Sequence, residues 1–348
     1  MNYIGYFVYP LHDDFGGAEV RAIEFEKQFN KLTKENNIDI KIKRVLKKND
    51  LDNIEAIIIY GGHYKNHGFL QYIKSKYDLT IITSSVFVKN APSFLYYILS
   101  RIKKIKTTPR ITYEIYNESD WIFTNTEYEK EDLIHSFKLS SDNIVVLPNM
   151  INQSSILKMN YESYQDIVEE KKVKDSIICV GRIEPIKNQV FLIESVLKYD
   201  LDTHIIFIGS KNYEHTKYTK KFKHLIQQHP NKFTYVGKVN QNVLFNIMDS
   251  SKGLILPSLF ETTGRVALEA YILGIPLALS NLPTIKEYIS KKENVIYFES
   301  KKSKSIVDAI NKINQGTLGR RNYRQNVFYS YENGLEKYIN FFKKVLNY

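Results

Sequence analysis

The sequence predicts an α/β protein made of two Rossmann-like domains. Two observations indicate this. Short runs rich in β-branched residues alternate with amphipathic helical stretches along the chain, which is the pattern of parallel sheets covered by helices on both faces. The same alternation occurs twice, and a chain of 348 residues exceeds the length at which one hydrophobic core usually stops growing, about 250–300 residues.

The first half contains the strand candidates that would form one sheet, separated by amphipathic stretches such as 18–36 and 127–137. The strands are expected at "NYIGYFVY" (2–9), "DIKIKRV" (39–45), "AIIIYGG" (56–62), "LTIIT" (79–83), "WIFTNT" (121–126) and "NIVVLPN" (143–149).

The second half repeats the pattern after a polar stretch, 151–176, that we take as the link. Its strands are expected at 176–183, 204–210, 233–239, 253–258, 276–280 and 295–298, and its helices at 189–198, 216–228, 240–249, 264–273 and 303–314. We therefore expect a first domain over 1–160, a second over 161–325, and a final amphipathic helix within 326–348.

Composition restricts the partners. The formal net charge of +11 indicates an anionic partner, such as nucleic acid, a phosphorylated substrate or a membrane surface. No zinc-finger spacing or aromatic-basic repeat accompanies the charge, so we expect no nucleic-acid partner. The single cysteine, Cys179, excludes a disulfide within one chain. The first residues do not read as a signal peptide and the apolar runs are too short to span a bilayer, so we expect a cytoplasmic protein.

Ligands of doubly wound sheets bind beyond the carboxyl ends of the strands, and four motifs stand there. They are "FGGAE" (15–19), "IIYGGHY" (58–64), "VGRIEPIKN" (180–188) and "SLFETTGRVALEA" (258–270). In the third motif, Arg182 and Lys187 share one strand-to-helix loop. A planar guanidinium and a point charge suit a diphosphate, although a solvated loop is the alternative.

The fourth motif places two acids around a helix start. Gly264 allows a close turn, and the first helical amides, near Gly264, Arg265 and Val266, have no partner within the helix and can donate to a phosphate. Glu269 could accept hydrogen bonds from a ribose diol and Glu261 from the hydroxyls of a transferred sugar. This order of ribose, diphosphate and sugar is that of a nucleotide-sugar. The alternative is a charged turn before a solvated helix.

Five elements occur in an order that resembles one enzyme family. They are "GGAE" (16–19), "ESDWIFTNTEYEKEDLIHSF" followed by "NIVVLPN", "GRIEPIKN" (181–188), the E-x7-E pair after "PS", and the following "EA…GIPLALS". Together they resemble the retaining glycosyltransferases of family 4, the glycosyl transferases group 1. The resemblance implies a GT-B fold: two Rossmann-like domains facing each other across a cleft, with a C-terminal helix that crosses back to the first.

The resemblance also implies roles. Arg182 and Lys187 would bind the donor diphosphate, Glu269 the ribose, and Glu261 the sugar near its anomeric carbon. Gly16 and Gly17 would let their loop approach the donor phosphate and the acceptor. Further donor contacts are expected from Thr263, Gly264, Arg265 and Val266, and from the loop 236–241, which carries Lys238.

Several positions depart from the family pattern. Thr262 and Thr263 replace a Gly-Phe pair and could change which sugar fits, and Arg265 replaces an apolar residue. The family reads "PNG" where this chain has Met150 in the third position. Ser84 and Ser85 stand where many members have a histidine near the donor sugar, and His63 could approach the site instead.

We therefore expect a retaining, metal-independent hexosyltransferase that needs no cofactor. Its donor would be a nucleotide diphosphate sugar, with UDP favoured and GDP possible, and its acceptor a glycan or a lipid-linked molecule of bacterial surface polysaccharide synthesis. The alternatives are an epimerase or phosphorylase on the same fold, or a non-catalytic subunit. The Asp-x-Asp element in "NDLDN" (49–53) reads as a solvated turn, not a metal site.

The segment 93–110 joins an apolar run to five basic residues and no acid. With a helical period, Phe94, Tyr97, Ile98, Ile102 and Ile105 would share one face, as in a helix lying on an anionic membrane. The protein would then be peripheral on the inner face of the cell membrane. A core helix with a charged end is the alternative.

Overall fold

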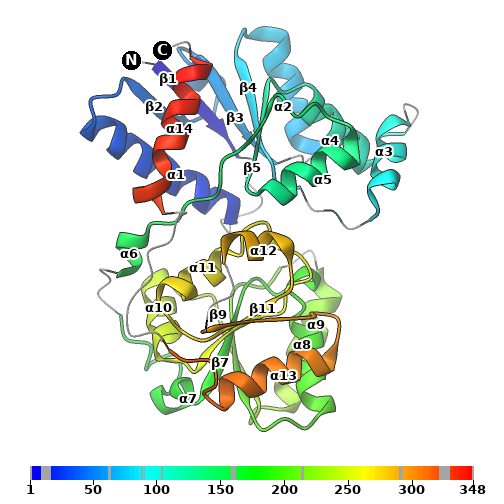
Figure 1. The fold of residues 1–348 in the computed structure, drawn as a ribbon, viewed down its shortest axis with the longest axis vertical. Helices are drawn as coiled ribbons and strands as arrows, with labels where there is room; N and C mark the ends of the chain where they lie inside the picture. Colours follow the sequence, from blue (N-terminus) through cyan, green and yellow to red (C-terminus); the bar gives the residue numbers. More distant parts are fainter. Residues whose placement is uncertain are drawn as a thin grey trace. The chain divides into compact units, whose positions relative to one another are not determined.

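The computed structural model describes residues 2–8, 17–61, 64–87, 89, 91–102, 105–157, 162–212, 215–289, 293–320 and 330–346. The chain forms two compact units (Figure 1). The first unit comprises residues 1–150 together with 329–348, and the second comprises 151–328.

The first unit is built on a parallel sheet of six described strands in the order β2-β1-β3-β4-β5-β6. Their bounds are β1 (Asn2–Phe7), β2 (Ile40–Arg44), β3 (Ala56–Tyr60), β4 (Thr80–Ser84), β5 (Trp121–Thr124) and β6 (Ile144–Val146). Each lies within a predicted strand or within one residue of it. The strand order reverses between β1 and β3, so the crevice at the carboxyl ends of these strands is where a doubly wound sheet binds its ligand.

Helices cover both faces of this sheet, whose inner strands β3 and β4 are buried on both sides. They are α1 (Gly17–Glu35), α2 (Tyr64–Lys76), α3 (Ser93–Arg101), α4 (Thr108–Asn117), α5 (Glu127–Phe137) and α14 (Tyr331–Val345), with a 3₁₀ turn at η1 (Lys48–Leu51).

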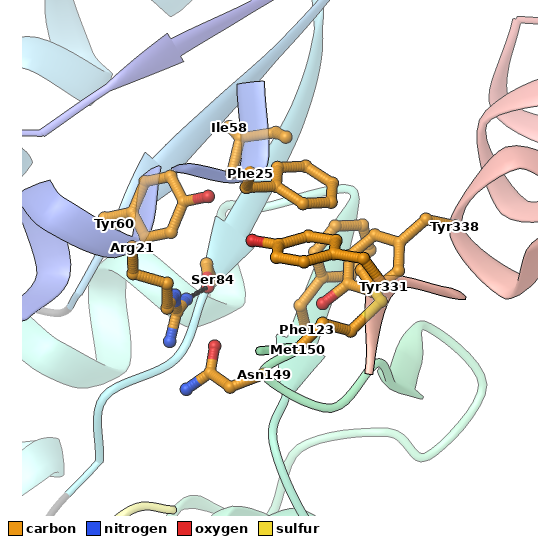
Figure 2. Close-up of a pocket in the computed structure, with 10 residues that line it drawn as sticks. All are labelled: Arg21, Phe25, Ile58, Tyr60, Ser84, Phe123, Asn149, Met150, Tyr331 and Tyr338. Carbon is orange, nitrogen blue, oxygen red and sulfur yellow. Dashed lines mark hydrogen bonds between the residues drawn. The ribbon is translucent and has the colours of Figure 1, made fainter. Parts of the chain in front are cut away.

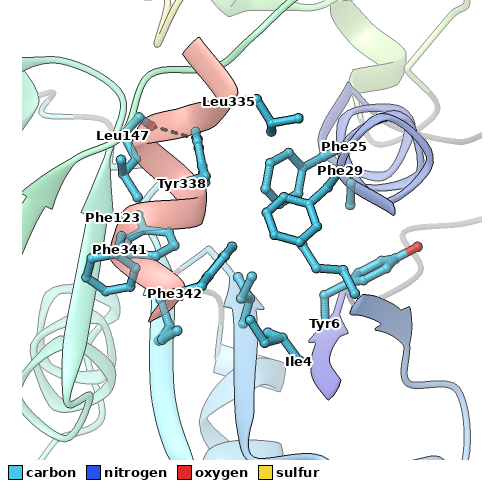
Figure 3. Packing of buried hydrophobic residues seen from close by; sticks show 14 of the residues in the cluster. Ile4, Tyr6, Phe25, Phe29, Phe123, Leu147, Leu335, Tyr338, Phe341 and Phe342 are labelled. Atoms are coloured by element: carbon cyan, nitrogen blue, oxygen red, sulfur yellow. Dashed lines mark hydrogen bonds between the residues drawn. The ribbon is translucent and has the colours of Figure 1, made fainter. Parts of the chain in front are cut away.

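The C-terminal helix α14 belongs to the first unit, as predicted. Figure 3 shows it beside α1, with Phe342 and Tyr338 pointing into a cluster with Phe25, Phe29 and Phe123. The rings of Phe29 and Phe342 meet edge to face at 5.4 Å between centroids. The Tyr338 hydroxyl donates to the Leu147 carbonyl oxygen at 3.0 Å. The end of the chain is thus fixed to the sheet that the beginning of the chain forms.

The single helical face predicted for residues 93–110 is wrong. Helix α3 ends at Arg101, and Ile102 is extended, with a ψ of 102°. The next helix starts a few residues later, because Thr107 caps α4 by accepting from the Arg110 amide at 3.2 Å and Pro109 fits its first turn. Exposed apolar side chains nevertheless remain here: Phe94, Leu95, Tyr97, Ile98 and Ile105.

The second unit has a parallel sheet of six described strands in the order β12-β11-β10-β7-β8-β9. The strands are β7 (Ser176–Val180), β8 (His204–Ile208), β9 (Phe233–Gly237), β10 (Gly253–Leu256), β11 (Leu277–Ser280) and β12 (Val295–Phe298). All six fall within predicted strands. The order reverses between β7 and β10, which places the switch point of this unit between those two neighbouring strands.

The helices of the second unit include three that the sequence patterns did not predict. Predicted helices correspond to α8 (Gln189–Lys198), α9 (Thr216–Gln228), α10 (Gln241–Ser250), α11 (Arg265–Ile272) and α13 (Ser303–Asn314); the unpredicted ones are α6 (Gln153–Leu157), α7 (Glu170–Lys174) and α12 (Pro283–Tyr288). The short α6 lies in the segment that we took as a link and packs against α11. Helices this short lack the two-turn periodicity that a sequence pattern needs.

His204 is a half-buried histidine of the second unit whose protonation we expect to cost stability. Its ring nitrogens contact the hydroxyl groups of Ser176 at 2.6 Å and Thr234 at 3.1 Å. Burial, helped by the charge of Lys172, lowers the pKa of His204 to about 4. A histidine whose pKa is lowered by folding takes up its proton more readily when unfolded. We expect the free energy of unfolding to fall as pH drops from about 6.5 towards 4. His204→Asn should reduce the difference between the free energies of unfolding measured with urea at pH 7 and at pH 5. An equal difference in both proteins would contradict this.

Candidate functional site

Two loops meet at the switch point of the second unit. Strands β7 and β10 are hydrogen-bonded neighbours, so the loops that follow them, 181–188 and 257–264, leave the same edge of the sheet. The Leu259 amide donates to the Ile186 carbonyl oxygen at 2.8 Å. This bond ties the loops together, and side chains that are far apart in the sequence converge there.

The first loop presents Arg182. Its backbone is fixed, because Gln189 Nε2 donates to the Arg182 carbonyl oxygen at 2.7 Å. Its guanidinium lies 3.4 Å from Glu184 Oε1 and its side chain is 51% exposed. Glu184 is buried and also accepts from Asn212 Nδ2 at 2.8 Å. Arg182 is therefore a half-exposed cation that one ion pair, with Glu184, anchors.

The turn that carries Arg182 depends on a close backbone approach. A Cβ atom added to Gly209, at the end of β8, would lie 2.1 Å from the Gly181 carbonyl oxygen, and Gly209 has a φ of +145°. Only glycine fits such a position. The backbone just after β8 therefore packs directly against the loop that follows β7 and restricts its path.

Lys187 and Glu261 form the centre of the cluster. Lys187 Nζ lies 2.5 Å from Glu261 Oε1, and the same oxygen accepts from Ser258 Oγ at 2.7 Å. The side chain of Glu261 is 11% exposed and that of Lys187 is 23% exposed. Thr284 Oγ1 of α12 donates to the Glu261 carbonyl oxygen at 2.6 Å. Glu261 is therefore held through both its side chain and its backbone.

Helix α11 begins at the end of the second loop, with Arg265 as its first residue. Gly264 caps it in the left-handed region, with a φ of +60°, and offers no capping side chain. The first hydrogen bond of the helix runs from the Leu268 amide to the Gly264 carbonyl oxygen. The amides of Arg265 and Val266 therefore precede the hydrogen-bond ladder of the helix, and together with the helix dipole they suit an anion.

Glu269 lies one turn into α11 and is buried. Arg265 Nε donates to Glu269 Oε1 at 3.0 Å. Each of the two acids of the E-x7-E pair is therefore matched with a cation: Glu261 with Lys187, and Glu269 with Arg265. A ligand that carries both phosphates and hydroxyl groups could replace these ion pairs with its own contacts. Its phosphates would bind Lys187 and Arg265, and its hydroxyl groups would donate to Glu261 and Glu269.

The structure brings most of the predicted donor residues to one edge, but not all. Arg182, Lys187, Glu261, Thr263, Gly264, Arg265, Val266 and Glu269 lie on the two loops and on α11. Lys238 follows β9, which β8 separates from β7. Gly17 begins α1 in the first unit. Gly16 and His63 lie outside the described residues.

Some residues of this cluster were not assigned a role from the sequence. Ser258 and Thr284 hold Glu261, and Glu184 holds Arg182. Ser258 stands at the end of a predicted strand, so the sequence could have indicated a role for it in the site. Thr284 gave no such indication, because α12, which carries it, was not predicted. Among the described residues, no group of three His, Cys, Asp or Glu side chains is arranged to hold a metal ion. In the Asp-x-Asp element, Asp50 accepts from the Leu46 and Lys47 amides.

Comparisons with known proteins return glycosyltransferases. Residues 160–328 match the family model of the glycosyl transferases group 1. An uncharacterized glycosyltransferase of Methanocaldococcus jannaschii is 26% identical over 65% of this chain and 60% of its own length. A probable sucrose-phosphate synthase of Thermosipho melanesiensis is 25% identical over 76% of each chain.

The fold has close counterparts among solved structures. HepE of Anabaena, crystallised with UDP and glucose, superimposes with a TM-score of 0.69, covering 99% of this chain and 100% of that one at 13% identity. The GT-B fold predicted from the sequence, with its two parallel six-stranded sheets, is confirmed.

Proposed function

We propose that the chain moves a sugar from a nucleotide diphosphate sugar to a hydroxyl group of an acceptor, with retention of anomeric configuration and without a metal ion, because residues 160–328 match the family model of the glycosyl transferases group 1. The observation that carries the proposal is the pairing of Lys187 with Glu261 and of Arg265 with Glu269 at the switch point of the second unit. A nucleotide diphosphate sugar carries the phosphates and hydroxyls that would match these four groups.

The main chemical task is to stabilise the diphosphate that leaves. Arg182 would grip two phosphate oxygens with its fork, Lys187 would supply a point charge, and the first amides of α11 would donate to the same group. Fixed donors aimed at developing charge usually contribute more to catalysis than any other single effect. Cations and helix amides would thus take the role that a metal ion plays in other transferases.

Retention would follow if the acceptor attacks on the face that the diphosphate leaves. A phosphate oxygen of the donor would take the proton of the acceptor hydroxyl as the new glycosidic bond forms and the old one breaks. Glu261 would hold the sugar near its anomeric carbon, and Glu269 the ribose. We favour a UDP-sugar as donor, since a structural relative was crystallised with UDP and glucose.

The proposed function predicts selective stabilisation by one class of nucleotide-sugar. A saturating donor, near 100 times its dissociation constant, should stabilise the folded state by about 2.7 kcal/mol. For a unit of this size that corresponds to a rise of about 5–10 °C in melting temperature. A thermal-shift panel of UDP- and GDP-sugars measures this, and slow donor hydrolysis identifies the sugar. No shift with any nucleotide-sugar would refute the proposal.

We also propose a lipid-linked acceptor, as in the assembly of surface polysaccharides, reached at an anionic membrane. No helix among the described residues is both long and apolar enough to span a bilayer. The exposed Phe94 and Ile98 of α3 and the exposed Ile105 beyond it are instead suited to lie on a surface. Arg101 is turned onto the protein, over the Tyr113 ring and bonded to the Phe137 carbonyl oxygen. The lysines that follow it in the sequence would therefore supply most of the attraction.

This surface predicts salt-sensitive binding to anionic vesicles. The test variant changes three lysines to glutamine: Lys106, and Lys103 and Lys104, the last two of which lie outside the described residues. It should bind anionic vesicles about a hundredfold more weakly, since each basic residue near such a membrane adds about 1 kcal/mol. The matched control changes Lys220, Lys221 and Lys223 of α9, which are exposed in the second unit, and should bind as the wild type does. Vesicle sedimentation at low and high salt measures both. A wild type that ignores anionic vesicles at low salt would favour a soluble acceptor.

A further inference from the structure

A second polar site lies in the first unit, whereas most of the predicted donor residues belong to the second. Figure 2 shows a small cavity at the carboxyl edge of its sheet, with Arg21 of α1, Tyr60 of β3 and Ser84 of β4 around it. The cavity is also lined by Asn149, just beyond β6, and by Tyr331 of α14. The strand order of this sheet reverses between β1 and β3, so this edge is where its fold places a ligand.

Arg21 is held in place by three contacts with uncharged groups. Its NH2 nitrogen donates to Ser84 Oγ at 2.6 Å and its NH1 nitrogen to Asn125 Oδ1 at 3.3 Å. The guanidinium also lies over the Tyr60 ring, 4.9 Å from the centroid. A guanidinium has five N–H groups, so these hydrogen bonds leave donors for a ligand.

Asn125 is itself oriented by a buried acid. Its Nδ2 donates to Glu129 Oε2 at 2.9 Å and to the Ser85 carbonyl oxygen at 3.3 Å. These two bonds leave Oδ1 to face Arg21. The carboxylate of Glu129 is taken up by Asn125, by the Ser85 hydroxyl and by the Phe87 amide. Glu129 therefore orients Asn125, and among the described residues its carboxylate is hydrogen-bonded to groups other than Arg21.

Arg21 has no carboxylate partner within the part of the chain that the structure describes. A cation partly removed from water without a counter-ion is costly, and the cost falls when an anion binds beside it. Among the described residues the guanidinium is held by neutral groups, which orient it without pairing its charge.

The size of the cavity limits how a ligand binds. Its volume of about 10 Å³ is room for about one water molecule, so a whole sugar does not enter it. The guanidinium of Arg21 and the side-chain amide of Asn149 are both among the groups that line this cavity (Figure 2). A small anionic group would approach these two side chains from outside.

We propose that Arg21 and the side chains around it bind an anionic group, a phosphate ester or a carboxylate, carried by the acceptor. A guanidinium fork matches the paired oxygens of both groups. The assignment to the acceptor rests on the proposed function, since the donor residues lie in the second unit. The anion site itself rests only on the geometry of the first unit.

The experiment uses Trp121, the single tryptophan of the chain, as a reporter. Trp121 lies on β5 two residues before Phe123, which lines the cavity. The full chain is titrated with glucose 6-phosphate, glucuronate and glucose while tryptophan fluorescence is followed. We expect at least one of the two anions to bind about ten times more tightly than glucose. Which of them binds distinguishes a phosphate ester from a carboxylate.

Variants identify the residue responsible. Arg21→Met should weaken anion binding at least tenfold, and Arg21→Lys should retain part of it. Asn149→Asp gives a second test that leaves Arg21 in place, because a new carboxylate in the lining of the same cavity should repel an anionic ligand. The control is Lys31→Met, an exposed position on the same helix, which should bind as the wild type does.

The outcomes separate the two proposals. If neither anion binds more tightly than glucose, or if Arg21→Met and Asn149→Asp bind anions as the wild type does, the anion site is overturned. Binding of UDP and GDP to the wild type is measured in parallel. A chain that binds sugar anions through Arg21 but binds no nucleotide supports the anion site and overturns the proposed transferase.

Discussion

Replacing Arg182 or Lys187 by alanine should lower the turnover number about 10²- to 10³-fold, which is the usual loss when one charge-stabilising donor is removed. Both side chains stand on the loop after β7, and the diphosphate they would hold gains negative charge as the sugar leaves. The Lys187 variant should be the more impaired. Without its 2.5 Å contact to Lys187, the carboxylate of Glu261 would face the departing phosphates unneutralised.

The measurement is the rate of sugar transfer, or of slow donor hydrolysis, at saturating donor. Arg182→Lys keeps the charge but loses the planar fork, so it should fall between the wild type and Arg182→Ala. Lys221→Ala is the matched control, because Lys221 is an exposed cation of the same unit that pairs with Glu194 on α8. Wild-type turnover in both alanine variants would show that this loop does not hold the leaving group.

The inner strands could be predicted from the sequence because most of them are short apolar runs buried on both faces. "SIICV" and "HIIFI" are examples, and they become the adjacent strands β7 and β8. The order of the strands, and with it the position of each switch point, could not be predicted in the same way. Strand order depends on which crossovers pack together, and residues such as Ser258 and Thr284 gain meaning only once β7 and β10 are known to be neighbours.

The pairing within the site could not be predicted for a related reason. Glu261 and Lys187 are far apart in the chain, and the bond between Leu259 and Ile186 brings their loops together. Arg265 and Glu269 are four residues apart on one helix, a spacing that allows an ion pair in any sequence. The sequence pattern did not predict that the helix ends at Arg101. Apolar residues can keep a helical spacing along the sequence even where the backbone is no longer helical.

Replacing the two acids should separate nucleotide binding from transfer. Glu269→Gln should weaken binding of free nucleotide diphosphate about ten- to hundredfold, because a hydrogen bond to a charged group contributes about 1.5–3 kcal/mol and Glu269 would hold the ribose. Glutamine has nearly the shape of glutamate, so the buried position on α11 stays filled. Arg265, which loses its ionic partner, remains partly exposed and can be solvated.

Glu261→Gln should spare the free nucleotide and instead reduce transfer, because Glu261 would touch only the sugar. Binding of the nucleotide could even become tighter, since Lys187 would no longer be paired with a carboxylate and would be available to the phosphates. Calorimetry with UDP and GDP alone measures binding in both variants, and transfer at saturating donor measures catalysis. Ser258→Ala is a milder companion, because it removes one hydrogen bond to Glu261 and leaves the charge. Equal losses of nucleotide affinity in Glu261→Gln and Glu269→Gln would refute the assignment of one acid to the sugar and the other to the ribose.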